Sequence, residues 1–174
     1  SEESLTECHF QGGKDMLTIY FNNKPESQIF CGKSVVLGGS SQINSFSSDS
    51  YYGDLSSILL RNLPFWAEFK RTPNLEVTLL PDFEEKIEKV ANITIHENVT
   101  NLAGVPTWNI VLAKKILEIT GKNNLLEVWP NLEFYTHGGV SFKPYREQFK
   151  KLIPSDNMYY LENYNASEGY FALQ

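Results

Sequence analysis

The sequence predicts an α/β fold, in which a largely parallel sheet is flanked by helices within a single domain. Strand-like and helix-like segments alternate along the chain, which is the order typical of parallel sheets. The 174 residues, 41% of them hydrophobic, are enough for one buried core. Three predicted strands end in the small-residue turns "LGGSS", "HGGVSF" and "YNASEG". A parallel sheet would bring these turns to one edge, where ligands bind.

The first half of the chain predicts two helices and a strand. Apolar residues recur at near-helical spacing in "SEESLTECHFQGGKDMLTIYFNN", although Gly12 and Gly13 weaken the middle of that helix. The stretch "KSVVLGGSS" predicts a short buried strand followed by a Gly-Gly turn. The stretch "FSSDSYYGDLSSILLRNLPFW" predicts a loop, then a helix from Leu55 to Arg61 that stops before Pro64.

The second half predicts alternating helices and strands. Asp82 is a predicted helix N-cap, and Glu85 three residues later forms a variant of the capping box. The strand "VTNLAGVP" precedes the clearest helix, which begins near Pro106 and stops at Gly121. The strand "LEFYTHGG", the short helix "YREQFKKLI" and the strand "NMYYLENY" follow. Tyr164 is the expected last residue of that final strand.

Composition and charge narrow the class of protein. The net charge of −6 argues against a broad nucleic-acid surface. No apolar stretch approaches the ~20 residues of a membrane span, and no signal-peptide pattern follows Ser1. Cys8 and Cys31 lack the spacing of a metal site. We therefore expect a cytoplasmic protein that binds neither nucleic acid nor membrane.

The stretch "NYNASEG" contains the residues best suited to chemistry. The ring of Tyr164 offers a flat surface for a purine, and the hydroxyl of Ser167 can donate to a phosphate oxygen. Glu168 is a hard oxygen ligand of the kind that Mg²⁺ prefers. Small residues between them let backbone N–H groups approach an anion. Taken alone, so short a stretch is also typical of an ordinary β-turn with a solvated carboxylate.

Several longer stretches give these residues a wider context. They are "GKSVVLGGSSQIN", "SSDSYYGDLS", "LPFWAEF", "AGVPTWNIVLAKKILEITGKNNLLEVWPNLEFYTHGGVSF" and "YNASEG". Through nearly its whole length the chain resembles the auxin-responsive acyl acid–amido synthetase family, especially its bacterial members. The stretch "YNASEG" is similar to the Tyr-X-X-Ser/Thr-Glu motif of the adenylate-forming, or acyl-activating, superfamily to which that family belongs.

The resemblance implies an acid–amino acid ligase that uses ATP and Mg²⁺. A carboxylic acid would be activated as an acyl-adenylate, and an amino acid would then displace AMP to give an amide. Two alternatives stay open. One is a thioester-forming acyl-CoA ligase, and the other is a non-catalytic ligand-binding or interaction module of the same fold.

The resemblance also implies the site residues. Glu168 would be the catalytic residue and the Mg²⁺ ligand, and Tyr164 would pack on adenine. The implied nucleotide-binding residues are His137, Gly138, Gly139, Asn163, Tyr164, Asn165, Ala166, Ser167 and Glu168. Trp108, Tyr170 and Phe171 are candidates for contact with the acyl substrate. For Trp108 the alternative is a core anchor, the role expected of Trp66 and Trp129.

The resemblance further implies that residues 1–174 form one partial domain. The Ser/Thr/Gly-rich phosphate loop of the family is expected before residue 1. A ribose-binding Asp and a lid with a catalytic Lys are expected after residue 174. The chain would then need the remainder of its own polypeptide as a partner, and we expect it to be inactive alone.

Three other features are expected to be structural. The stretch "GGSSQ" lacks both the Lys-Ser/Thr of a P-loop and the spacing of a hydrolase nucleophile turn. It predicts a turn that, in the resembling family, borders the acyl pocket. His9 and His96 occur in helical segments without companion ligands, so we expect surface or hydrogen-bonded roles for both.

Overall fold

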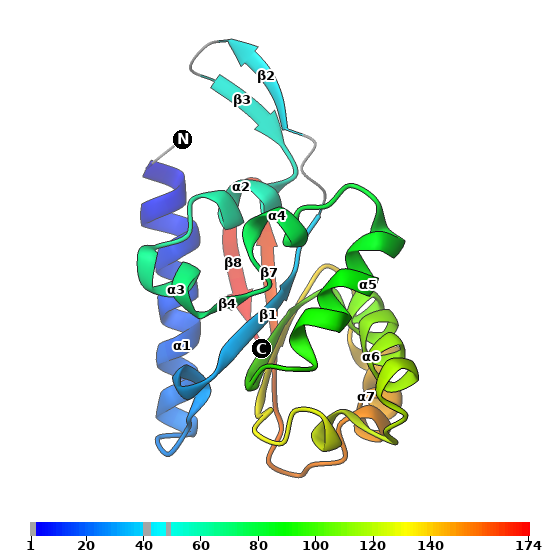
Figure 1. The fold of residues 1–174 in the computed structure, drawn as a ribbon. Helices are drawn as coiled ribbons and strands as arrows, with labels where there is room; N and C mark the ends of the chain where they lie inside the picture. The colour runs from blue at the N-terminus through cyan, green and yellow to red at the C-terminus, as the bar shows by residue number, and fades with distance from the viewer. Residues whose placement is uncertain (1–2, 40–42, 48–49) are drawn as a thin grey trace.

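A six-stranded sheet forms the centre of the molecule (Figure 1). A computed structural model of the chain describes residues 3–39, 43–47 and 50–174. The strand order is β4-β1-β5-β6-β7-β8, and all neighbours are parallel except β7 and β8. The strands are β1 (Lys33–Leu37), β4 (Arg71–Thr72), β5 (Val99–Gly104), β6 (Phe134–His137), β7 (Tyr159–Ala166) and β8 (Gly169–Leu173). The predicted α/β class and largely parallel sheet are confirmed.

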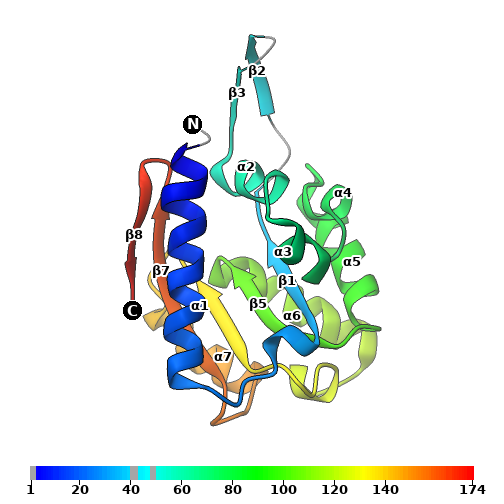
Figure 2. The same cartoon turned by 90° about the vertical axis from the view of Figure 1, so that its left-hand side faces the viewer.

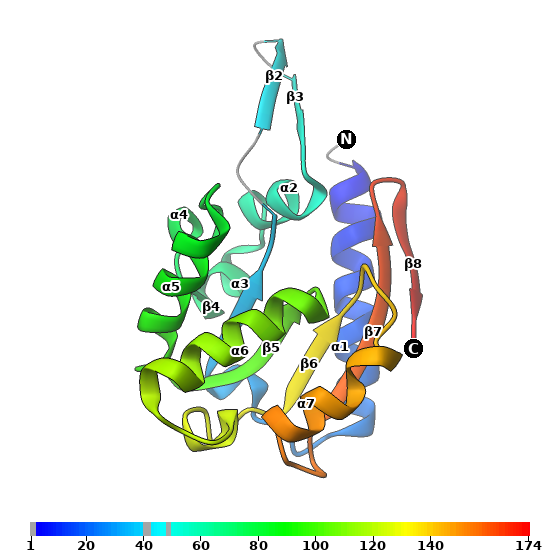
Figure 3. The same cartoon turned by 90° about the vertical axis from the view of Figure 1, so that its right-hand side faces the viewer.

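Helices cover both faces of this sheet (Figures 2 and 3). Helix α1 lies on one face, and α5, α6 and α7 lie on the other. The helical segments are η1 (Ser4–Phe10), α1 (Gln11–Asn23), η2 (Ile29–Cys31), α2 (Leu55–Arg61), α3 (Phe65–Lys70), α4 (Leu75–Thr78), α5 (Phe83–Thr94), α6 (Pro106–Thr120), η3 (Leu125–Glu127), η4 (Lys143–Tyr145) and α7 (Arg146–Leu152). Among the residues described, no helix combines the length and apolar character needed to cross a membrane.

Alternation along the strands produces a separate core on each face. Successive side chains of a strand point to opposite faces. Phe134 and Leu161 therefore pack against α1, where the ring of Phe134 stacks on Tyr20 with centroids 4.2 Å apart. Tyr135 points the other way and stacks on Phe149 of α7 at 5.0 Å. The sheet is thus buried on both faces, as expected of parallel strands.

Local signals place several helix ends where the sequence predicts them. The Asp82 side chain accepts a 2.7 Å hydrogen bond from the backbone N–H of Glu85. Gly121 ends α6 in the left-handed conformation, with φ of +66°. Helix α2 spans Leu55–Arg61, the predicted range. These ends depend on short-range chemistry, which is why sequence alone locates them.

Two predictions about strands need correction. An antiparallel hairpin of β2 (Ile43–Ser47) and β3 (Ser50–Gly53) lies where a loop was expected. Strand β7 continues past Tyr164 to Ala166, because its end pairs with β8. Both differences come from antiparallel ladders, whose partners the local pattern does not reveal. Residues 40–42, the end of the predicted "GGSSQ" turn, lie outside the described residues.

The three tryptophans have different environments. Trp129 is a buried anchor, and its indole N–H donates a 2.8 Å hydrogen bond to the Thr94 carbonyl. Trp66 is 45% exposed and meets Phe30 edge-on, so its prediction as a core anchor is wrong. Helix α3 has no buried residue, and the apolar pattern of "LPFWAEF" does not reveal this. Trp108 is half-buried at the start of α6.

Candidate functional site

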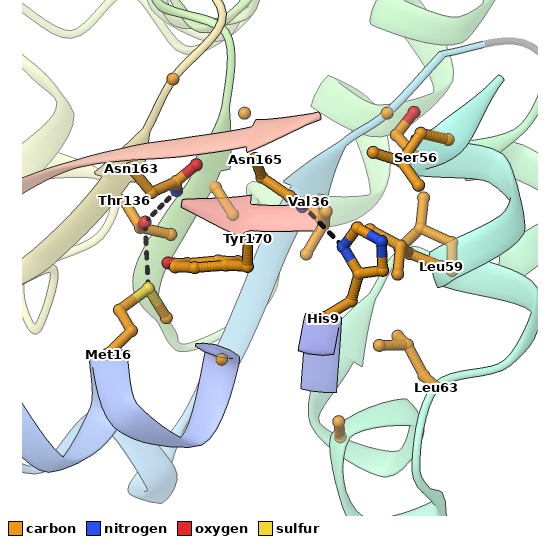
Figure 4. Close-up of a pocket in the computed structure, with 18 of the residues that line it drawn as sticks. His9, Met16, Val36, Ser56, Leu59, Leu63, Thr136, Asn163, Asn165 and Tyr170 are labelled. Carbon is orange, nitrogen blue, oxygen red and sulfur yellow. Dashed lines mark hydrogen bonds between the residues drawn. The ribbon is translucent and has the colours of Figure 1, made fainter. Parts of the chain in front are cut away.

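A cavity of about 560 Å³ opens at the carboxyl ends of the parallel strands. Its walls come from the ends of β1, β5 and β6, from β7, and from the helical segments η1, α1 and α2 (Figure 4). The Gly-Gly turn after β1, the turn after β6 and two asparagines of β7 therefore meet in one place. This edge is where open α/β sheets bind ligands, because successive strand ends and their turns converge there.

The cavity is lined mainly by apolar side chains. These apolar side chains come from helices, from strands and from the segments between them. They include Met16, Leu17, Val36, Leu37, Leu55, Leu59, Leu60, Leu63, Trp66 and Trp108. The polar side chains are fewer and include His9, Asn163 and Asn165. An apolar lining with a small number of placed polar groups suits an organic ligand that has an apolar body.

The turn after β6 is built around two glycines. A Cβ on Gly138 would lie 2.5 Å from the Asn163 carbonyl oxygen, so only glycine fits there. Gly139 has φ of +80°, which also favours glycine. Beside this turn, the Asn163 amide donates to the Thr136 hydroxyl at 2.9 Å, and Thr136 contacts the Met16 sulfur at 3.2 Å. The turn and β7 are therefore held close together at the cavity wall.

His137 is a neutral histidine at neutral pH. The side chain is 2% exposed and stacks on Phe142, with ring centroids 4.1 Å apart. Burial, together with a smaller contribution from the positive charge of Arg146, lowers the pKa of His137 to about 4. The Nδ1 atom is buried without a hydrogen-bond partner among the described residues. His137 therefore acts as a wall of the cavity rather than as a cation.

The low pKa of His137 predicts a pH dependence of folding stability. The unfolded chain binds a proton at His137 near pH 6.5, whereas the folded chain does so only near pH 4. Stability must then fall as pH falls through this window, because the unfolded state binds more protons. We expect His137→Phe, which keeps an aromatic ring against Phe142, to lose less stability between pH 7 and pH 4. Urea unfolding at a series of pH values measures this, and parallel profiles would contradict it.

Successive side chains of β7 point to opposite faces of the sheet, so the predicted nucleotide-binding residues on this strand do not all face the same cavity. Asn163 and Asn165 line the large cavity, whereas Tyr164 is 61% exposed and contacts Phe171 at 5.3 Å between centroids. A second cavity of about 330 Å³ lies beside Tyr164. Both cavities are lined by Gly139, Asn163 and Asn165. The two cavities therefore adjoin along the turn after β6 and the end of β7.

Ser167 and Glu168 form the exposed turn between β7 and β8. Neither residue lines either cavity, so the structure does not bring Glu168 together with His137. The register explains this separation, because His137 pairs with Glu162 and β7 continues beyond it to Ala166. Glu168 also takes part in none of the ion pairs among the described residues. Its carboxylate is thus free to meet a ligand from solvent.

The three residues predicted to contact the acyl substrate do not all lie in one cavity. Trp108 and Tyr170 line the large cavity, and Trp108 packs on Phe83 at 5.8 Å between centroids. Burial raises the pKa of the Tyr170 hydroxyl to about 12, with a smaller contribution from Asp15. Phe171 lines neither cavity and is 56% exposed. Two of the three candidates therefore lie in one apolar cavity.

The N-terminal helix contributes residues that the sequence analysis did not assign to the site. His9 Nδ1 donates a 2.8 Å hydrogen bond to Asn165 Oδ1, and the Tyr170 N–H donates to Cys8 Sγ at 3.2 Å. The ring of Tyr170 also rests on Gly12. His9 is a buried, hydrogen-bonded residue, which is one of the two roles expected for it. No local sequence pattern predicts that His9 lies beside Asn165, because the two residues are 156 positions apart.

Lys86 is a second residue that the sequence did not single out. Its side chain is 3% exposed, and Nζ donates to the carbonyl oxygens of Gly38 and Gly39 at 3.2 and 3.1 Å. Burial lowers the pKa of Lys86, and the charge of Asp54 opposes that shift. Lys86 therefore holds the turn after β1 at the edge of the large cavity.

A comparison of sequences decides the family. Residues 3–158 match the model of the GH3 family N-terminal domain. The chain belongs to the GH3 family. This is the family of auxin-responsive acyl acid–amido synthetases, whose members are acid–amino acid ligases. No individual curated protein matches the chain. The cavities at the strand ends are thus the candidate site of a GH3 domain.

The described part of this GH3 chain holds no group of three or more His, Cys, Asp or Glu residues that could bind a metal ion. A Mg²⁺ ion that is coordinated by substrate phosphates and water needs few ligands from the protein, and one carboxylate is enough. Glu168 is such a carboxylate, since it is exposed and free of ion pairs within the described ranges. The residues present therefore fit a phosphate-bound Mg²⁺ and not a metal cage built by the protein.

Proposed function

We propose that this GH3 chain carries the nucleotide and acyl sites of an enzyme that forms an acyl-adenylate and converts it into an amide. The observation that supports this most is the pair of adjoining cavities, which share Gly139, Asn163 and Asn165. One is open beside the exposed ring of Tyr164, and the other is apolar. An acyl-adenylate likewise joins a planar base and a charged phosphate to an apolar acyl group.

The proposed reaction has two steps. An oxygen of the substrate carboxylate attacks the α-phosphorus of ATP, the bond from that phosphorus to the bridging oxygen breaks, and pyrophosphate leaves with the electron pair. The amine of an amino acid then attacks the acyl carbon and loses a proton. The bond from the acyl carbon to the AMP oxygen breaks, and AMP leaves. Both steps depend on alignment and on neutralising phosphate charge, so a protein nucleophile is unnecessary.

In this proposal the nucleotide lies against the turn after β6 and the end of β7. Tyr164 packs on adenine, and Gly138 and Gly139 leave room for the base. The Ser167 hydroxyl and the backbone around Ala166 meet the phosphates. The exposed Tyr164 ring and the second cavity support these roles. Asn163 and Asn165 line both cavities and would lie where base-bearing and acyl-bearing parts of the intermediate join.

Glu168 would hold Mg²⁺ in this proposal. The bound ion would neutralise phosphate charge as pyrophosphate leaves. The contribution of the chain is to present a carboxylate on a short, defined hairpin turn between β7 and β8. The chain enters η1 beside that turn (Figure 2). We propose that the phosphate loop precedes η1 in the same polypeptide and completes the site there.

The apolar cavity would bind the acyl part of the acid. Its volume of about 560 Å³ and its leucine-rich lining favour a carboxylic acid with an apolar or aromatic body. Trp108 and Tyr170 would contact that body. Phe171 is left out of the proposed acyl site, because it packs on Tyr164 outside the cavity.

We further propose that the lid with the catalytic Lys follows in the same polypeptide, in a cytoplasmic enzyme that resembles bacterial members of the family. The matching model describes an N-terminal domain, which supports a larger enzyme. Cys8 and Cys31 are both free thiols, as is usual in a reducing compartment.

Pyrophosphate release tests the proposal. The full-length protein, with ATP–Mg²⁺ and a mixture of amino acids, is supplied with a panel of carboxylic acids. We expect acid-dependent pyrophosphate release together with an amide product, and neither from residues 1–174 alone. Coenzyme A replaces the amino acids in a parallel set, where a thioester product would favour the acyl-CoA ligase instead. The absence of pyrophosphate with every acid would overturn the proposed adenylation.

A further inference from the structure

His9 presents one ring nitrogen to the large cavity. The side chain is 5% exposed and lies on η1, with Nδ1 2.8 Å from Asn165 Oδ1 (Figure 4). Because an amide oxygen only accepts hydrogen bonds, Nδ1 carries the proton. In the neutral ring Nε2 is then an acceptor. It has no partner among the described residues, although His9 lines the cavity.

Four other polar groups of the lining are paired within the protein or covered by it. Ser56 accepts from the Gly39 N–H at 2.7 Å, and the Asn163 amide donates to Thr136. The Nδ1 atom of His137 and the Tyr170 hydroxyl also lack partners in the described chain, but protein atoms cover both. The Nε2 atom of His9 is not covered in this way. It is therefore an unpaired acceptor that a ligand in the cavity can reach.

The apolar side chains around Nε2 of His9 make it energetically unfavourable to leave this acceptor unpaired. Leu59 and Leu63 line the cavity together with His9 (Figure 4). A polar atom left without a partner among apolar groups is unfavourable, and a ligand that supplies a hydrogen-bond donor removes that cost. An apolar analogue of the same ligand leaves the cost in place. The cavity thus discriminates between ligands at this atom.

We infer that His9 is a specificity-determining residue, which selects acyl acids that carry a hydroxyl or N–H donor apart from the activated carboxylate. The inference rests on the proposed function, because it places the acyl group in the large cavity. The bond to Asn165 fixes the ring of His9, so that Nε2 faces the acid in one orientation. A donor on the acid pairs with it, whereas an ether oxygen at the same place does not.

Matched acids and two variants of the full-length protein test this inference. The probes are benzoic and phenylacetic acids, the hydroxy isomers of each, and the corresponding methoxy isomers. His9→Gln places an amide near the position of Nε2, whereas His9→Asn places an amide near Nδ1 and leaves the cavity side empty. His96→Asn is the control, because His96 is exposed outside the cavity. Pyrophosphate release gives kcat/KM for each acid, and thermal unfolding shows whether each variant folds.

We expect the wild-type protein and the His96 control to favour at least one hydroxy acid over its methoxy partner by about tenfold, as one buried hydrogen bond allows. His9→Asn should lose that preference mainly through a higher KM for the hydroxy acid, and His9→Gln should keep most of it. Equal loss of rate with all acids in both variants, or an unchanged preference in His9→Asn, would overturn the role of His9. Absence of pyrophosphate release with every acid would instead overturn the proposed function, and this inference with it.

Discussion

Replacing Glu168 with Gln in the full-length protein is expected to reduce acid-dependent pyrophosphate release by about 100-fold or more. A neutral amide is a much weaker ligand for Mg²⁺ than a carboxylate, and the loss of one preorganised electrostatic contact at a phosphoryl centre has effects of this size. Folding should be unaffected, because Glu168 is exposed and forms no ion pair in the described part of the chain. Raising the Mg²⁺ concentration should restore part of the rate.

The matched control for this variant is Glu88→Gln. Glu88 is also exposed, on helix α5, and lines neither cavity. The control should keep the wild-type rate, and the free energy of unfolding of both variants should equal that of the wild type to within about 0.5 kcal/mol. A Glu168→Gln protein that folds and reacts at the wild-type rate would remove Glu168 from the proposed mechanism.

The two glycines of α1 are expected to respond to Ala substitution with opposite signs. A Cβ on Gly12 would lie 2.4 Å from Cγ and 2.9 Å from Cβ of Tyr170. The base of that ring cannot swing away, because the Tyr170 backbone is paired in β8 and bonded to Cys8. Overpacking of this kind costs about 1–3 kcal/mol. We therefore expect Gly12→Ala to lower the free energy of unfolding by about 2 kcal/mol.

The neighbouring glycine provides the control. Apart from its chain neighbours and the backbone of its own helix, no atom of the described residues lies within 4 Å of a Cβ built on Gly13. Ala is favoured over Gly in a helix interior by up to about 1 kcal/mol, so Gly13→Ala should raise the free energy of unfolding. Urea denaturation of both variants measures the contrast. Stabilisation by Gly12→Ala would show that α1 does not pack against the β7–β8 hairpin as the structure has it.

Sequence predicted the parts of the fold that short-range chemistry controls. The N-cap at Asp82, the stop at Gly121 and the range of α2 each depend on residues within one helical turn. Strand and helix alternation was sufficient for a largely parallel sheet. The β2–β3 hairpin and the full length of β7 were missed, since both depend on antiparallel partners rather than on their own residue patterns.

The candidate site was predictable only in part. The turns after β1 and β6 and the asparagines of β7 meet because parallel strands share one carboxyl edge, which topology alone implies. Sequence could not show that Tyr164 lines only the second cavity, whereas Asn163 and Asn165 line both. Nor could it show that Lys86 turns inward to the Gly-Gly turn, since its neighbours on α5 have the pattern of a solvated face.

The contacts between η1 and the β7–β8 hairpin have a consequence for synthesis of the protein. His9 and Asn165 are 156 positions apart, and Cys8 and Tyr170 are 162 apart. During translation the first helix must therefore leave the ribosome long before its partners exist. Until then its apolar side, including Tyr20, is uncovered and open to misassociation. The first helix can therefore reach its native packing only after β7 and β8 have been synthesised.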